Sequence, residues 1–217
     1  MADIELTAFS WVPPMPRGLV RDLRVRWALE EIGLPYVTRL FDRRTSGPED
    51  RKPEQPFGQV PAFSEGDVEM FESGAICLWL AERSPALLPS DPAGRARAMS
   101  WTFAALNSVE PSILLMQYVV LFDADKPGAA EFAPTAEARL ADRLGQLSEA
   151  LGDNDWLDGA FSVADLLMVS VLRQVTRNNR LAAFPNLAAY VARGEARPAF
   201  PRALASHMGD FIADEET

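Results

Sequence analysis

The stretch that decides the fold is residues 57–80, which read F-G-Q-V-P-A-F-S-E-G-D-V-E-M-F-E-S-G-A-I-C-L-W-L. A short apolar run containing Pro61 comes first, followed by a turn at Glu65-Gly66-Asp67. Val68 to Phe71 then alternates apolar and acidic residues, which is the pattern of a half-buried strand. Because proline donates no hydrogen bond to a sheet, Pro61 belongs at a strand start, on an edge or at a bulge. The stretch therefore predicts a strand, a tight turn, a second strand and a helix.

The same stretch carries groups that suit an amino-acid ligand. A cis Val60–Pro61 bond, which an X–Pro pair adopts at about 0.5–1 kcal/mol, would leave the backbone of Val60 free to pair with an extended ligand. Ser73 is the predicted N-cap of the helix, and a helix start attracts a carboxylate. Glu72, directly before it, suits an ammonium group. The plainer interpretation is a strand proline, a surface acid and a capping serine.

Composition limits the possible partners. The chain has 217 residues, 48% of them hydrophobic, and its 31 acidic and 21 basic residues give a net charge of −10. This balance argues against broad binding to a nucleic-acid backbone, although a local basic pocket for a small anion is compatible with it. One cysteine and one histidine make a Cys/His metal site and an intrachain disulfide untenable. We expect no metal, no signal peptide, no membrane span and a reducing, cytoplasmic setting.

The order of the predicted elements indicates two domains. The first 83 residues read β-α-β and then β-β-α, which matches a thioredoxin-like fold. Their long helix, from about Gly18 to Ile32, is terminated by Gly33 and Pro35. Residues 84–92 are a proline-rich linker, and only helical patterns follow it. We therefore expect a thioredoxin-like domain over 1–83 and an all-helical domain over 93–217, with a bend at Pro111.

A capping box marks one buried helix of the second half. Ser162 is the predicted N-cap in F-S-V-A-D-L (residues 161–166), and Asp165 is its reciprocal partner. Phe161 and Leu166 would form the accompanying hydrophobic staple. The role of this motif is structural. We also expect Cys77 to lie in the core and His207, near the C-terminus, to be a surface residue.

These motifs resemble those of the glutathione transferase family. The resemblance rests on V-P at 60–61, E-S at 72–73, R-V-R-W-A-L-E-E-I-G-L-P-Y at 24–36, and F-S-V-A-D after W-L-x-G. It covers nearly the whole chain and implies a glutathione site at Gln59, Val60, Pro61, Glu72 and Ser73. In this family Val60 would pair with the cysteinyl backbone of glutathione, while Glu72 and Ser73 would hold its γ-glutamyl end.

The sequence departs from the family pattern at the position of the residue that activates the glutathione thiol. Leu19 occupies the place of a helix-start serine, and residues 1–35 contain neither tyrosine nor cysteine. Lowering a thiol pKa by two units takes about 2.7 kcal/mol, which one charge-assisted hydrogen bond of about 1.5–3 kcal/mol and a helix start can supply. Ser10 or Arg21 is the candidate. The alternatives are a plain loop serine and an ion pair between Arg21 and Asp22.

The resemblance implies attack of the glutathione thiolate on a small hydrophobic electrophile, by a homodimer. The second substrate would lie between the domains, against Trp11, Met15, Phe103, Asn107 and Met116. A rival hypothesis is a non-catalytic glutathione-binding or regulatory protein of the same fold. A third is a glutathione-dependent isomerase or dehalogenase, which shares the site.

Overall fold

The computed structural model describes residues 3–176 and 178–213, and its internal contacts separate two units. Residues Met1–Leu88 and Ala196–Thr217 form the first, and Pro89–Glu195 form the second. The first boundary falls within the proline-rich stretch 84–92. The second is not visible in the order of sequence patterns, because the last helix of the chain joins the first unit.

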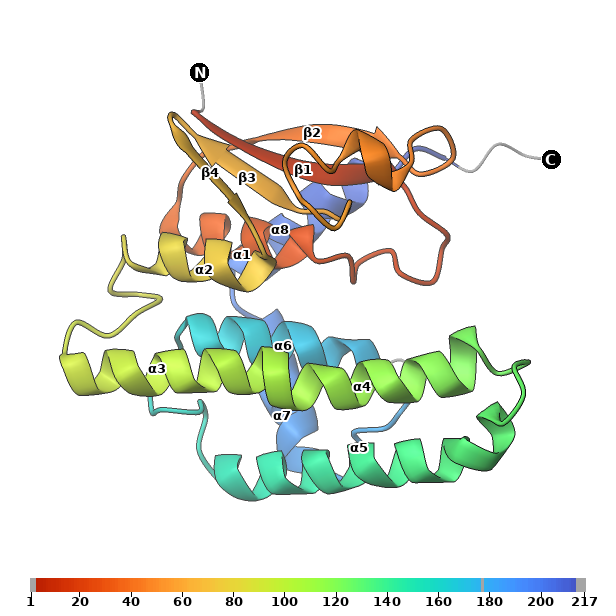
Figure 1. The fold of residues 1–217 in the computed structure, drawn as a ribbon. Helices are drawn as coiled ribbons and strands as arrows, with labels where there is room; N and C mark the ends of the chain where they lie inside the picture. The colour runs from red at the N-terminus through yellow and green to blue at the C-terminus, as the bar shows by residue number, and fades with distance from the viewer. Residues whose placement is uncertain (1–2, 177, 214–217) are drawn as a thin grey trace. The chain divides into compact units, whose positions relative to one another are not determined.

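The first unit contains a four-stranded sheet in the order β2-β1-β3-β4 (Figure 1). Its strands are β1 (Ile4–Trp11), β2 (Val37–Asp42), β3 (Ala62–Glu65) and β4 (Val68–Phe71). β1 pairs in parallel with β2 and antiparallel with β3, and β4 pairs antiparallel with β3. The tight turn between β3 and β4 has Gly66 at a φ of 57°, which suits glycine. The predicted strand, turn, strand and helix are confirmed.

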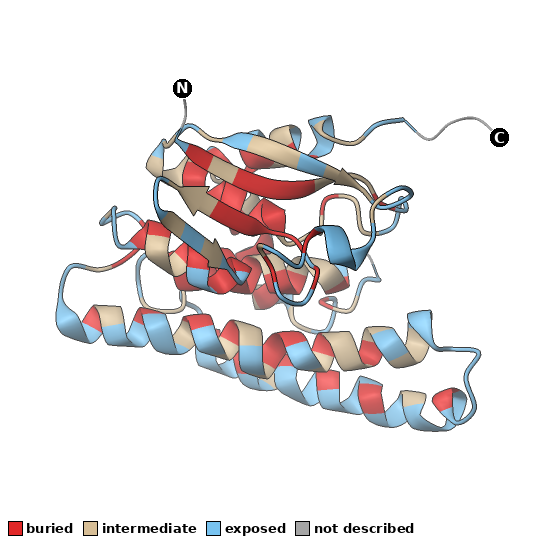
Figure 2. Cartoon of the chain, turned by 45° about the horizontal axis from the view of Figure 1, so that its top comes forward, coloured by how far each residue is buried: buried red, intermediate tan, exposed pale blue. Residues whose placement is uncertain are grey.

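Three helices lie on one face of this sheet: α1 (Asp22–Ile32), α2 (Ser73–Ala81) and α8 (Ala199–Gly209). α1 is buried over most of its length, and its Trp27 ring meets the edge of Phe200 from α8 at 4.9 Å between centroids. Figure 2 shows the buried residues concentrated along β1 and the helices beneath it. As predicted, Gly33 ends α1 in a left-handed conformation.

α1 begins later than the predicted Gly18. The backbone at Gly18 has a φ of 78°, and Leu19 N–H donates to the carbonyl of Pro16 in a turn. A left-handed residue interrupts a right-handed helix, so regular structure starts only at Asp22. The residues before Asp22 form a loop that lines part of the pocket described below.

The second unit is all-helical. Its elements are α3 (Pro92–Ala104), η2 (Ala105–Val109), α4 (Glu110–Gln117), η3 (Tyr118–Phe122), α5 (Ala129–Leu151), α6 (Val163–Thr176) and α7 (Pro185–Glu195). α6 is its most buried helix and packs against α3 and α7. The segments η2 and η3 are π-helical. η2 directly precedes α4, which contains Pro111, so a π-helical segment lies next to the position of the predicted bend.

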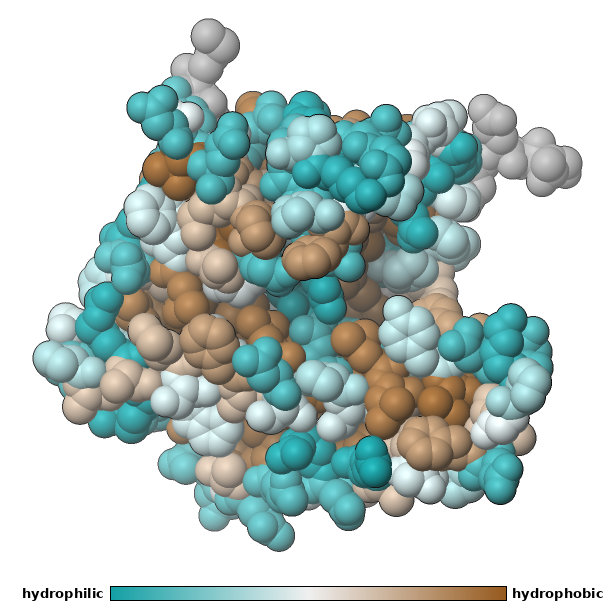
Figure 3. All heavy atoms as spheres, viewed as in Figure 1, coloured by the Kyte–Doolittle hydropathy of each residue, from teal (hydrophilic) through white to brown (hydrophobic). Residues whose placement is uncertain are grey.

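The stretch Pro92–Phe122 bears on the expectation that the chain has no membrane span. Within the described residues it is the one helix that is long and apolar enough, by length and composition, to cross a membrane. Core helices of soluble proteins meet the same criterion, and this one packs against α5 and α6. Figure 3 shows apolar side chains gathered near its end, where Leu121 and Phe122 are exposed. The sequence lacks a continuous apolar run, yet this helix is apolar enough on average.

Both side chains of the predicted capping box bond at the start of α6, with Ser162 accepting from the second helical residue in place of the third. Ser162 Oγ accepts the N–H of Ala164 at 3.2 Å, and Asp165 Oδ2 accepts the N–H of Ser162 at 2.9 Å. The second carboxylate oxygen of Asp165 accepts the N–H of Leu157 and the hydroxyl of Tyr190, each at 2.9 Å. Burial raises the pKa of Asp165 above its ordinary value although these hydrogen bonds oppose the shift. The motif therefore joins α6 to the preceding loop and to α7.

Removing Ser162 or Asp165 should destabilise the fold unequally. We expect Ser162→Ala to lower the free energy of unfolding by about 1 kcal/mol, the usual effect of losing an N-cap. Asp165→Ala should lower it by more than about 2 kcal/mol, because it leaves several buried donors without an acceptor. Urea denaturation measures both. Asp142→Ala, on the exposed face of α5, is the control and should change stability by less than about 0.5 kcal/mol. Equal effects at positions 142 and 165 would contradict the assignment.

Candidate functional site

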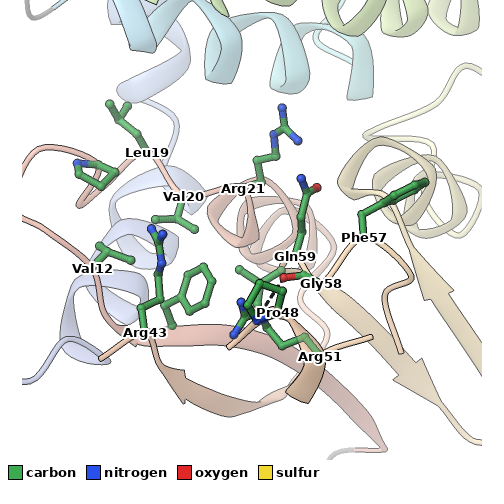
Figure 4. A pocket seen from close by; sticks show the side chains of 13 residues that line it. Val12, Leu19, Val20, Arg21, Arg43, Pro48, Arg51, Phe57, Gly58 and Gln59 are labelled. Atoms are coloured by element: carbon green, nitrogen blue, oxygen red, sulfur yellow. Dashed lines mark hydrogen bonds between the residues drawn. The ribbon is translucent and has the colours of Figure 1, made fainter. Parts of the chain in front are cut away.

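The first unit contains a pocket of about 450 Å³ (Figure 4). Three segments build it: the end of β1, the loop that leads into α1, and residues 43–60. Its lining residues are Phe9, Val12, Pro16, Leu19, Val20, Arg21, Arg43, Pro48, Arg51, Phe57, Gly58, Gln59 and Val60. The pocket thus brings together two of the residues predicted to bind glutathione, Gln59 and Val60, and one predicted catalytic residue, Arg21.

The predicted peptide edge is present at Val60. The Val60–Pro61 bond is cis. Within residues 3–176 and 178–213, the backbone N–H and C=O of Val60 have no hydrogen-bond partner. Two residues later the backbone is paired within the protein, because Ala62 N–H donates to Thr7 Oγ1 of β1 at 2.6 Å. An extended ligand lying in the pocket could therefore pair with Val60 in the direction of the strand.

A buried glutamine holds the loop before Val60. Gln55 is 3% exposed, and its Oε1 accepts the N–H of Phe57 at 2.7 Å and that of Gln59 at 3.1 Å. Its backbone carbonyl accepts the N–H of Gly58 at 2.8 Å. One residue thus satisfies three successive N–H groups from inside the loop. The conformation that presents Gln59 and Val60 to the pocket follows from these bonds.

Arg51 supports the same loop and adds positive charge. Its Nε donates to the carbonyl of Gly58 at 2.8 Å, the hydrogen bond drawn in Figure 4. The guanidinium lies against the rings of Phe9 and Phe41, 5.1 and 5.7 Å from their centroids. Burial, followed by the neighbouring charge of Arg43, lowers the pKa of Arg51. With Arg21 and Arg43, three guanidinium groups line one pocket of an acidic chain.

The start of α2 differs from the expected geometry. Ser73 is the first helical residue, and Glu72 stands at the N-cap position with a φ of 69°. Ser73 is therefore not the N-cap that its residue type predicts. It is buried, and Arg24 Nη1 donates to its Oγ at 3.4 Å, while Glu72 is exposed. Neither lines the pocket described above, so their role in ligand binding stays a prediction.

Cys77, one turn further along α2, is a core residue. It is fully buried, and burial raises the pKa of its thiol to about 12. A thiol that remains protonated is a poor nucleophile. The expectation that Cys77 has a packing role agrees with this environment.

The two candidate thiol partners lie in different surroundings. Arg21 lines the pocket, whereas Ser10 does not. The β1–β2 register shifts between Phe9 and Trp11, and the carbonyl of Ser10 at this bulge accepts the N–H of Ile212 at 2.9 Å. Val20 lines the pocket next to Arg21, and its backbone N–H has no hydrogen-bond partner within the part of the chain that the structure describes.

The residues predicted to contact a second substrate belong to both units. In the first unit, Met15 is half-exposed and Trp11 lies beneath the Arg44 guanidinium, 5.3 Å from its ring centroid. In the second unit, Phe103 and Asn107 are exposed on α3 and η2. Met116 is 0% exposed, so it belongs to the core of that unit. The other four remain predictions.

Sequence reasoning missed several residues that shape the site. Arg51 and Gln55 lie in and next to a charged segment, yet both are buried and hold the loop that forms one wall of the pocket. The Arg51 guanidinium lies against the rings of Phe9 and Phe41 from two strands, a contact that no local pattern indicates. His207 was expected at the surface but is 2% exposed, because α8 packs on α1. For metals, no group of three or more suitable side chains occurs among the described residues.

Comparison with known proteins connects this geometry to one family. Residues 23–90 match the family model of the glutathione S-transferase N-terminal domain, and residues 114–207 match that of its C-terminal domain. The glutathione S-transferase GstA of Escherichia coli O157:H7 is 31% identical over 173 residues, which are 77% of this chain and 83% of the relative.

Two further relatives span nearly all of the chain. The disulfide-bond oxidoreductase YfcG of Escherichia coli K12 is 28% identical over 93% of this chain and 96% of its own length. A glutathione transferase from Burkholderia graminis, solved with two glutathione molecules per subunit, is 27% identical with a TM-score of 0.79. That alignment covers 94% of this chain and 88% of the solved one. The two-domain fold is therefore confirmed.

The pocket wall should depend on the absence of a side chain at Gly58. Its φ is 65°, and a Cβ there would lie 2.6 Å from the Cβ of Pro48. We expect Gly58→Ala to lower the free energy of unfolding by more than about 1 kcal/mol, through the left-handed backbone and the clash. Gly47→Ala is the matched control, since Gly47 has a φ of −93° and open space around its Cβ position. The urea denaturation midpoints of the two variants measure this difference. Similar midpoints for Gly58→Ala and Gly47→Ala would contradict the predicted clash at Gly58.

Proposed function

Since this chain belongs to the glutathione S-transferase family, we propose that it binds glutathione and directs the thiolate at a small electrophile. The glutathione sulfur forms a bond to an electrophilic carbon, and the leaving group departs from that carbon with the electron pair of the broken bond. Following the family's usual form, we propose a cytoplasmic homodimer. No metal takes part in this proposal.

The observation that carries the proposal is the unpaired backbone edge of Val60 inside a basic pocket. The cysteinyl residue of glutathione would donate to and accept from Val60, extending the sheet by one short strand. Arg43 and Arg51 favour an anionic ligand in a chain of net charge −10. The γ-glutamyl end would reach the start of α2, with its carboxylate at Ser73 and its ammonium at Glu72.

In this proposal the residues at the start of α1 stabilise the thiolate of bound glutathione. Arg21 brings a positive charge to the pocket, and Val20 offers a backbone N–H. One such charge-assisted hydrogen bond contributes about 1.5–3 kcal/mol, which equals one to two units of thiol pKa. A dedicated tyrosine or serine is therefore not required. Ser10 is the weaker candidate because it lies outside the lining.

A second candidate function is glutathione-dependent reduction of disulfides. The 28% identity to a disulfide-bond oxidoreductase over 93% of this chain supports it, as does a relative solved with two glutathione molecules per subunit. The first thiolate attacks a disulfide sulfur and releases one thiol, and a second glutathione resolves the mixed disulfide to give glutathione disulfide and the other thiol. This chemistry also needs only a stabilised thiolate. Glutathione binding without conjugation or disulfide reduction would favour a non-catalytic glutathione-binding protein. Turnover confined to isomerisation or dehalogenation would favour a glutathione-dependent isomerase or dehalogenase.

Glutathione affinity should depend on Glu72 and Ser73. We expect Glu72→Gln and Ser73→Ala each to weaken binding about tenfold or more, the effect of one lost charge-assisted hydrogen bond. Isothermal titration measures the dissociation constant. Glu69→Gln, which removes the same charge from an exposed position on neighbouring β4, should bind like the unmodified chain. Binding that is absent, or unaffected by either change, would contradict the site.

Substitution of Arg21 and of Ser10 should separate the two thiol partners. We expect Arg21→Met to raise the pKa of bound glutathione by about one unit, so turnover at neutral pH falls about tenfold and recovers as pH rises. Ser10→Ala should leave both quantities unchanged. Ultraviolet absorbance of the bound thiolate gives the pKa. Rates are measured with an aryl halide and with a small disulfide, which also distinguishes the two candidate reactions. The reverse result would assign the role to Ser10.

A further inference from the structure

The segment His207–Ile212 contacts residues 10–21 at three points. These residues are the end of β1 and the connection to α1, and are called the loop 10–21 below. This loop supplies Val12, Pro16, Leu19, Val20 and Arg21 to the pocket. It contains little regular structure of its own between β1 and α1. Its position therefore depends on what it packs against, and the contacts come from the other end of the first unit.

The innermost contact is a histidine buried between two partners. His207 Nε2 accepts the backbone N–H of Gly18 at 3.2 Å, and its Nδ1 lies 2.9 Å from Asp22 Oδ2. Because the Gly18 N–H is a donor, Nε2 must carry the lone pair and Nδ1 the proton, which is donated to Asp22. The imidazole is thus a bridge with one donor and one acceptor, and it fixes Gly18 relative to α1.

Asp22 is itself held in place, so the bridge has a rigid base. Arg26 Nε donates to Asp22 Oδ2 at 2.8 Å, and its Nη1 donates to Ser206 Oγ at 2.9 Å. Its Nη2 pairs with Asp210. The side chains of Asp22 and Arg26 are each 1% exposed. The orientation of His207 is thereby determined by α1 and α8 together.

The two outer contacts involve the residues that follow α8. The Phe211 ring stands perpendicular to the His207 ring at 5.0 Å, and the Arg17 guanidinium lies 5.6 Å from the Phe211 centroid. Arg17 Nε in turn donates to the carbonyl of Val12 at 3.1 Å. Ile212 N–H donates to the carbonyl of Ser10 at the β1 bulge. The loop is therefore tethered at its beginning, middle and end.

We propose that His207–Ile212 is a positioning element that holds the loop 10–21 in the conformation that lowers the thiol pKa of bound glutathione. The inference rests on the proposed function. Gly18 is followed directly by Leu19, Val20 and Arg21, so a displaced Gly18 moves the Val20 N–H and the Arg21 side chain away from the thiol. His207 acts through the loop and touches no reacting atom.

Two full-length variants remove the tethers one at a time. His207→Leu deletes the acceptor for Gly18, and Ile212→Pro deletes the N–H given to Ser10. For both we expect the pKa of bound glutathione, measured by thiolate absorbance, to rise by about one unit, and glutathione affinity to fall about tenfold. Turnover with saturating glutathione should recover at high pH, where the thiolate forms without help.

Each variant has a matched control. His207→Gln offers one acceptor and one donor and should restore much of the lowered thiol pKa. Ile212→Ala shortens the side chain and keeps the N–H. Arg202→Ala loses the bonds of α8 to Glu30 of α1 but none to Asp22, Arg26 or the loop, so the thiol pKa should be unchanged. An unchanged thiol pKa in both His207→Leu and Ile212→Pro, or an equal rise in Arg202→Ala, would overturn the proposal.

Amide hydrogen exchange of residues 12–20 provides a readout without ligand. Exchange in this loop should accelerate in His207→Leu and Ile212→Pro and stay at the unmodified rate in Arg202→Ala. If the unmodified chain binds no glutathione, the proposed function fails at its first step, and the thiol-positioning role fails with it. If glutathione binds normally and loop exchange does not respond to either substitution, only the positioning role fails.

Discussion

The buried pair of Asp22 and Arg26 is the constraint on which the first unit depends. Burial alone would lower the pKa of Arg26, but the charges of Asp22 and Asp210 outweigh it and the pKa is raised. A buried ion pair adds little net stability over apolar packing, yet leaving one partner alone inside the protein is strongly unfavourable. α1 and α8 can therefore associate in few ways other than the one that satisfies the guanidinium. We infer that this requirement fixes His207, and through it the loop that lines the pocket.

The sequence predicted those parts of the fold in which the signal is local. The alternation at Val68–Phe71, the terminating Gly33 and the capping box at Ser162 and Asp165 each involve neighbours within a few residues, and each is present in the structure. The two features that the sequence predicted wrongly, the start of α1 and the exposure of His207, depend on residues far away in the sequence. The start of α1 depends on a left-handed Gly18 bonded to α8, and the burial of His207 depends on α1, whose Asp22 is 185 residues away in the sequence. No pattern within either segment indicates the other.

The same division explains the candidate site. Val60 and Pro61 could be identified because a proline near a strand has few permitted places, and their geometry agrees with the expectation. The basic wall of the pocket could not, since net charge describes the whole chain and not one cavity. Arg51 becomes an interior residue only when aromatic rings from β1 and β2 cover it. Ser10 was considered because it is the only hydroxyl between the predicted first strand and the predicted first helix, and it lies at the bulge of β1, outside the pocket lining.

The return of α8 to the first unit has a consequence for synthesis on the ribosome. When the first 88 residues have emerged, the sheet, α1 and α2 are available, but the surface of α1 that receives α8 still faces water. Asp22, Arg26 and Trp27 on that surface acquire their α8 partners, which are His207, Asp210 and Phe200, only after α3 to α7 have been made. Domains usually fold as units in the order of their synthesis. Here the all-helical unit is complete before the one that begins the chain, so the nascent protein should finish folding at its N-terminal half.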